Sequence, residues 1–120
     1  DALKRRCMHL FIPFPDARTE ERIVAARLPG IAQRLNRQLV TFIQQLRGED
    51  LKKLPSLAET LDWARVVMLM NADQLEVELV RDTLNVLLKF EVDIETVGPK
   101  LTEMTRKAQR EAGGIDAARA

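Results

Sequence analysis

The side chains with the most distinctive chemistry lie near the start of the chain. Arg5 and Arg6 are adjacent in the stretch ALKRRC, followed by Cys7 and then His9. One cysteine and one histidine in the whole chain cannot build a metal site alone. No base that would activate the Cys7 thiol is identifiable, so we expect a small buried hydrophobic residue there. From physical chemistry alone, the two arginines complement the negative end of a helix that finishes near Cys7.

A second group of polar side chains, Ser56, Glu59 and Thr60, lies in PSLAETLDWARVVMLM. The Ser56 hydroxyl and the Glu59 carboxylate have the spacing of a reciprocal capping box, which predicts a helix start at Ser56. An apolar residue recurs every three or four positions of this helix, and Trp63 widens the face. We expect Trp63 in the core or at a subdomain interface, and this helix at the centre of the fold. The repeating positions are Leu57, Leu61, Ala64 and Met68.

The stretch MHLFIPFP, residues 8–15, is the one strand-like run in the sequence. Both of its faces are largely apolar, as in a sheet covered by helices on both sides, and His9 would lie beside that sheet. Pro13 restricts the strand to an edge or an end, since it cannot donate to a ladder. No second strand candidate exists to pair with it. We therefore expect its sheet in sequence outside this chain or in a partner.

The remaining patterns are helical. Asp16 is the expected N-cap of a helix that LPG ends at residues 28–30, and Gly48 is placed for a left-handed stop after the next helix. The last helical region is broken or kinked at Gly98–Pro99, and its second half is polar on most faces. The predicted fold is mainly α, a helical bundle of four packed helices plus a peripheral C-terminal helix, preceded by one orphan β-strand. The expected helices cover residues 16–27, 31–47, 56–70, 75–89 and 92–112.

Composition narrows the class of protein. The chain has 120 residues, 46% hydrophobic and 31% charged, which suits one soluble domain with a real core. A net charge of +1 argues against a dedicated nucleic-acid surface. No signal peptide is visible, and no apolar run approaches the roughly 18 residues of a membrane span. With its single cysteine, the chain is expected in a reducing cytoplasm. Because it begins at Asp1, we also expect a piece of a longer protein.

Several spaced motifs together resemble a known family. They are ALKRRC, HLFIPFPD, RIVAARLPGI, PSLAETLDWA and RDTLNVLLKFEVDIE, within about residues 1–97. This combination resembles the C-terminal end of a MoxR-type AAA+ ATPase, in the CoxD-like branch. The resemblance implies that residues 1–15 finish the nucleotide-binding α/β core, that residues 16–112 form the helical lid, and that residues 113–120 are a frayed tail. Composition and periodicity alone do not indicate ATPase ancestry.

The resemblance also implies roles for individual residues. Arg6 first, and Arg5 second, would be the arginine finger that reaches the nucleotide of the neighbouring subunit in a hexameric ring. A guanidinium stays charged and neutralises charge that spreads over the transferred phosphoryl group. ATP and Mg²⁺ would be bound by the full-length parent, a hydrolase, and not by this chain alone. Indeed, the sequence contains no GxxxxGK[ST] loop.

The helix that starts at Ser56 corresponds to the family's second-sensor helix. Its lid face near the nucleotide would include Ser56, Glu59, Thr60 and Trp63. An arginine is often found at this helix start, but here the sequence reads SLAET, and Arg65 lies nearly two turns further on. Direct sensing of phosphate by the lid is therefore not expected, and the lid would act through domain motion.

The resemblance implies an ATP-driven chaperone in the maturation or assembly of metalloenzyme complexes. Its partners would be copies of itself, a client metalloenzyme and a von Willebrand factor A-domain protein, with no nucleic acid and no membrane span. The alternative from another class is a free-standing helical protein-interaction adaptor whose strand adds to a partner's sheet edge. A third possibility, a helical DNA-binding domain, is disfavoured by the near-neutral charge and by the acidic start of the helix at Ser56.

Overall fold

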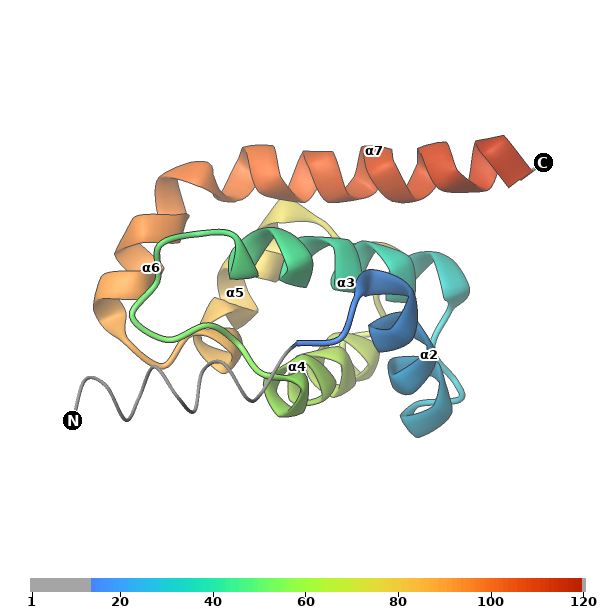
Figure 1. Ribbon diagram of the computed structural model, residues 1–120, viewed down its shortest axis with the longest axis horizontal. Coiled ribbons are helices and arrows are strands. Elements are labelled where there is room, and N and C mark those ends of the chain that lie inside the picture. Colours follow the sequence, from blue (N-terminus) through green and yellow to red (C-terminus); the bar gives the residue numbers. More distant parts are fainter. Residues whose placement is uncertain (1–13, 120) are drawn as a thin grey trace.

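The computed structural model describes the backbone of residues 14–119 and the side chains of residues 14–111. All regular structure in this part of the chain is helical, and the helices pack into one bundle (Figure 1). The predicted strand at residues 8–15 lies almost wholly outside the described residues. In chain order the helices are α2 (Ala17–Arg27), α3 (Gln33–Arg47), α4 (Leu57–Leu69), α5 (Val77–Leu87), α6 (Glu91–Val97), the 3₁₀ turn η1 (Gly98–Lys100) and α7 (Leu101–Arg119).

The helix starts follow the predicted capping residues. The Asp16 carboxylate accepts a hydrogen bond from the Thr19 amide at 2.8 Å, and this bond holds the pKa of Asp16 below its ordinary value. Ser56 and Glu59 form the predicted capping box at the start of α4. The prediction for Gly48 was wrong, because it adopts φ −88° and ψ −6°, in the right-handed region. The left-handed residue in the described part is instead Asn71, with φ 56°, just after α4.

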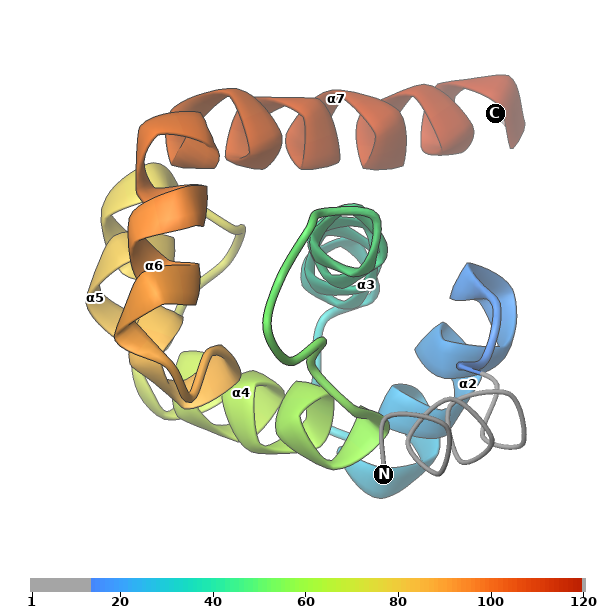
Figure 2. The same ribbon diagram turned by 60° about the vertical axis from the view of Figure 1, so that its left-hand side comes forward.

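Helix α3, and not α4 as predicted, occupies the middle of the bundle. Figure 2 looks nearly along α3 and shows the other helices arranged around it. It packs against α2, α4 and α7, while α4 packs mainly on α5. The sequence of α3 explains its place, since apolar side chains are fully or almost fully buried along its whole length. These side chains are Leu35, Leu39, Val40, Phe42, Ile43 and Leu46.

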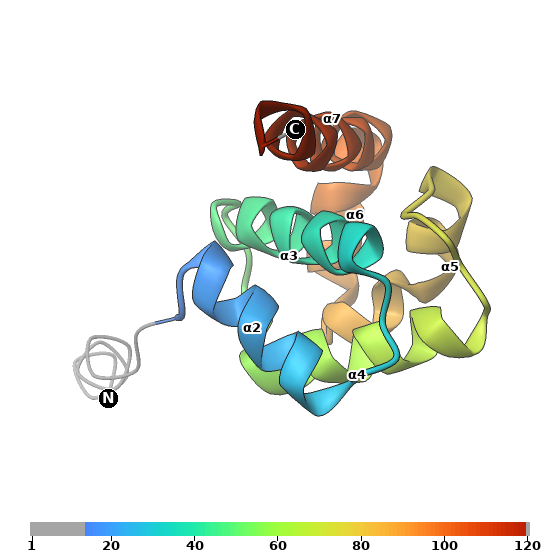
Figure 3. The same cartoon turned by 90° about the vertical axis from the view of Figure 1, so that its right-hand side faces the viewer.

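Helix α7 is not peripheral, which corrects the prediction for the C-terminal helix. It lies alongside α3 and runs in the opposite direction (Figures 1 and 3). In the part of α7 whose side chains are described, the buried face is a narrow stripe of Leu101, Met104, Thr105 and Ala108. These occur at helical spacing, but most other positions of α7 are polar, and that masked the stripe in the sequence. The Gln45 side chain adds a hydrogen bond to the Met104 carbonyl at 3.0 Å.

In the C-terminal part of the chain, the predicted helix break agrees with the structure and the predicted helix end does not. The predicted break at Gly98–Pro99 is a 3₁₀ turn that leads into α7. Helix α7 extends to Arg119, whereas the sequence predicts a helix end near residue 112. Trp63 lies fully buried in the core, as predicted, with its ring tilted 44° against Phe42 at 5.5 Å between centroids.

Candidate functional site

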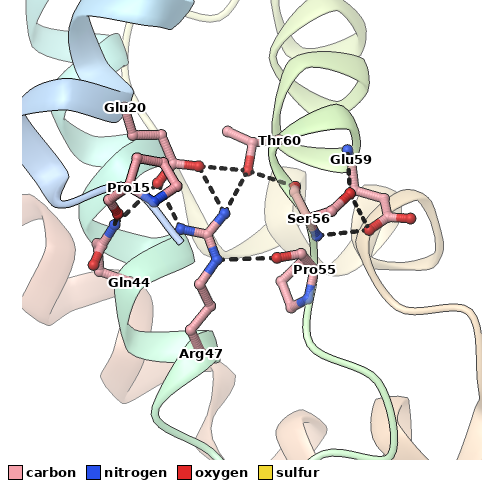
Figure 4. Close-up of polar contacts among 8 residues, drawn as sticks. All are labelled: Pro15, Glu20, Gln44, Arg47, Pro55, Ser56, Glu59 and Thr60. Carbon is pink, nitrogen blue, oxygen red and sulfur yellow. Dashed lines mark hydrogen bonds and ion pairs between the residues drawn. The ribbon is translucent and has the colours of Figure 1, made fainter. Parts of the chain in front are cut away.

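A buried ion pair joins α2 to α3. Glu20, in the first turns of α2, has no exposed surface, and the Arg47 side chain at the end of α3 is 6% exposed. The guanidinium donates from Nη1 to Glu20 Oε1 at 2.8 Å and from Nη2 to Oε2 at 2.7 Å (Figure 4). This is the bidentate geometry in which a guanidinium matches a carboxylate best.

Two neutral side chains complete the coordination of the buried carboxylate. The Thr60 hydroxyl of α4 donates to Glu20 Oε2 at 3.0 Å, and Gln44 Nε2 of α3 donates to Oε1 at 3.0 Å. The carboxylate therefore accepts from three side chains on α3 and α4. Because its oxygens are already bonded within the chain, Glu20 is placed to hold helices together and not to act as an acid or base. We call Glu20, Gln44, Arg47 and Thr60 the Glu20 cluster.

The Glu20 cluster also holds the chain as it enters the bundle. Arg47 Cζ lies 4.5 Å from the centroid of the Phe14 ring, and Gln44 Nε2 donates to the Pro15 carbonyl at 3.3 Å. On the other side, Arg47 Nε donates to the Pro55 carbonyl at 3.0 Å, just before α4 (Figure 4). One arginine thus ties the entering segment, α2, α3 and the start of α4 to a single point.

The predicted lid-face residues Ser56 and Glu59 are occupied by the capping box. Glu59 Oε1 accepts from the Ser56 amide at 2.7 Å and from the Ser56 hydroxyl at 2.9 Å, and Lys53 lies 3.2 Å away. Burial raises the pKa of Glu59, but these hydrogen bonds and Lys53 outweigh burial and hold the pKa below its usual range. A carboxylate that stays ionised at this helix start does not favour an anionic phosphate beside it.

The other two predicted lid-face residues, Thr60 and Trp63, are buried. Thr60 belongs to the Glu20 cluster, and the Trp63 indole N–H donates to the Thr83 hydroxyl of α5 at 2.7 Å. Their polar groups are thus bonded within the bundle. The nucleotide contact that the resemblance implies for the four residues stays a prediction.

The arginine-finger candidates Arg5 and Arg6 lie outside the described residues, as do Cys7 and His9. Arg65 is exposed on α4 and pairs with Asp62 at 3.4 Å, so it does not reach the start of the helix. Among residues 14–111, no group of three acidic, histidine or cysteine side chains is arranged to hold a metal ion. No helix in the described range is long and apolar enough to cross a membrane.

A second buried carboxylate was missed by the sequence analysis. Asp93 of α6 is 2% exposed and accepts from the backbone amides of Lys52 and Lys53 at 2.7 and 3.2 Å. It fixes the polar connection between α3 and α4, and the Lys52 ammonium adds to this by lying 4.4 Å from the centroid of the Phe90 ring. Asp93 and the two lysines are about 40 residues apart in sequence, so no local sequence pattern predicts this contact.

Comparisons of the chain with protein-family models, with curated proteins and with solved structures found no match.

Proposed function

We propose that this chain is the C-terminal lid region of a MoxR-type AAA+ ATPase, which acts as an ATP-driven chaperone in the maturation or assembly of metalloenzyme complexes. The spaced motifs within residues 1–97 support this proposal. An all-helical bundle directly after Pro15 is what a lid following the last strand of a nucleotide-binding core requires.

The Glu20 cluster is the observation that carries the proposal. A lid transmits nucleotide-dependent motion only if it moves as one body with the segment that enters it. Phe14 and Pro15 are held by Arg47 and Gln44, which also hold α2 and α4. A displacement of the entering segment would therefore move three helices together.

ATP and Mg²⁺ belong to the parent protein in this proposal, and their chemistry is transfer of the γ-phosphoryl group to water. Of the residues in this chain, Arg6, and then Arg5, would stabilise the charge on a neighbouring subunit's nucleotide in a hexameric ring. A client metalloenzyme and a von Willebrand factor A-domain protein are the proposed partners, and the cytoplasm is the proposed location.

The test compares the 120-residue chain with the product of its full reading frame. We expect a Walker loop upstream in that frame, ATP hydrolysis by the full product, and none by the chain alone. The control is the full product with its Walker lysine replaced by alanine, which should not hydrolyse ATP. Turnover by the purified 120-residue chain, or a frame without a Walker loop, would overturn the proposal.

A free-standing helical adaptor is the second candidate. Large hydrophobic side chains exposed at two places on the described surface favour it, because such side chains often mark protein contacts. Leu69 and Met70 follow one another at the end of α4, and Phe90 and Val92 lie at the start of α6. A start codon directly before Asp1 would favour this candidate over the lid.

A further inference from the structure

The connection between α4 and α5 forms two adjoining hollows on the surface. One is lined by residues that include Arg34, Met70, Glu76 and Leu79, and the other by residues that include Ile31 and Met68. Both share the wall formed by Asn71, Ala72 and Asp73. We call the two hollows together the 71–73 groove. Ser56, Glu59, Thr60 and Trp63, the predicted site residues that the structure describes, do not line it.

The backbone directly after the wall of the 71–73 groove is held by contacts to two other helices. Gln38 Oε1 of α3 accepts from the Leu75 amide at 2.6 Å, and the Gln109 side chain of α7 donates to the Leu75 carbonyl. Asn71 closes α4 in the left-handed conformation. Because these bonds hold the chain at Leu75, directly after the wall, binding there would lose less conformational entropy.

Apolar side chains are exposed at the 71–73 groove and directly beside it in the sequence. Met70, which lines the groove, is 50% exposed, and Leu69, the residue before it, is 83% exposed. Met68 is half-buried beside them. Methionine is flexible and polarisable, and it adapts well to the irregular surface of a bound partner.

The charges at the groove favour a basic partner. Asp73 and Glu76 form no ion pair within the described part of the chain, and the Gln74 amide donates to Glu76 at 3.4 Å. Among the described residues that line this hollow, Arg34 is the single cation, and its guanidinium donates to Gln74 at 3.2 Å. Two carboxylates against one guanidinium leave a net negative rim beside exposed apolar side chains.

We propose that the 71–73 groove binds a short segment of another protein that carries a lysine or arginine next to apolar side chains. The apolar side chains would contact Leu69, Met70 and the half-buried floor. The cation would lie between Asp73 and Glu76. This goes beyond the proposed function and does not depend on ATPase ancestry, since it uses only described residues of the bundle.

The test is an NMR titration of the ¹⁵N-labelled chain with two synthetic 12-residue peptides. One contains leucine, alanine and lysine in an amphipathic pattern, and the other has glutamate in place of every lysine. We expect saturable shifts confined to the backbone of residues 30–32, 68–76 and 79 with the lysine peptide, and affinity about fivefold lower or worse for the glutamate peptide.

Amino-acid substitutions distinguish binding at the 71–73 groove from non-specific attraction between the peptide and the protein. The double substitution Asp73→Asn with Glu76→Gln should weaken the lysine peptide about fivefold, and Leu69→Ser with Met70→Ser should weaken both peptides. The matched controls are Asp82→Asn, an exposed acid of α5, and Val92→Ser, an exposed apolar residue of α6. Neither control should change binding.

Three outcomes would overturn the proposal. They are equal binding of the two peptides, shifts centred away from the groove, and unchanged affinity in both groove variants. Sedimentation tests the other occupant of such a surface. A wild-type dimer that the Leu69→Ser and Met70→Ser variant converts to a monomer would assign the groove to a second copy of this chain, against a foreign segment.

Discussion

The two oxygens of the Glu20 carboxylate each accept a hydrogen bond from a different terminal nitrogen of Arg47, at 2.8 and 2.7 Å. Neither side chain is more than 6% exposed. Taking two charges out of water is unfavourable, and close geometry with further hydrogen bonds is what offsets it. Thr60 and Gln44 provide those bonds. The pair therefore holds three helices in one specific arrangement.

Replacing one member of this ion pair should lower the free energy of unfolding far more than replacing both. We expect Arg47→Ala to lower the free energy of unfolding by about 3–5 kcal/mol, because it leaves Glu20 buried and unpaired. The double variant Glu20→Leu with Arg47→Met should recover most of this loss. Urea denaturation followed by circular dichroism measures both.

The matched control for Arg47→Ala is Arg65→Ala, which breaks the exposed pair with Asp62. It should change the free energy of unfolding by less than about 1 kcal/mol. If the two alanine variants were equally stable, the buried pair would not hold the helices together.

Local signals in the sequence predicted much of this fold. Side chains that cap their own helix can be predicted from a spacing of three or four residues. Asp16 and the pair Ser56 and Glu59 are examples. The boundaries of α2 and α4 follow from these caps, and the long apolar face of α3 follows from periodicity. The Gly48 prediction failed because the turn after α3 closes in the right-handed region, which any residue can adopt.

Local sequence patterns do not predict contacts between segments that are distant in the chain. In the sequence, Glu20 is an acid near the start of the helix that Asp16 caps, yet its partners lie 24 to 40 residues away. A buried acid and an exposed acid have the same local sequence signal, so only the packing of α2 on α3 distinguishes them. The place of α7 was missed for a related reason, since its narrow stripe has meaning only against the broad face of α3.

Glu59 should make the stability of the bundle depend on pH. Its pKa in the folded state lies below the ordinary value of 4.5. The unfolded state therefore binds more protons in this range, so the contribution of Glu59 is present above about pH 4.5 and is lost as pH falls through the folded pKa. Urea midpoints measured from pH 7 to pH 3 should fall less steeply in Glu59→Gln.

The control for this pH dependence is Glu95→Gln, which changes an exposed acid on α6. Glu59→Gln should also lower stability by about 1 kcal/mol at pH 7, because the capping box loses a charged acceptor. A pH profile of Glu59→Gln that matched the wild type would contradict this role for the carboxylate.

The arginine-finger proposal predicts different effects on ATP binding and on ATP hydrolysis. In the full reading-frame product, Arg6→Ala should leave ATP affinity nearly intact and lower hydrolysis by about a thousandfold, since the guanidinium would act on a neighbour's transition state. Arg5→Ala is the matched neighbour variant, and it should have the smaller effect. Equilibrium binding of a fluorescent ATP analogue and steady-state phosphate release measure the two quantities. Weakened ATP binding with unchanged turnover of bound nucleotide would assign Arg6 to ground-state binding. The arginine-finger role would then be wrong.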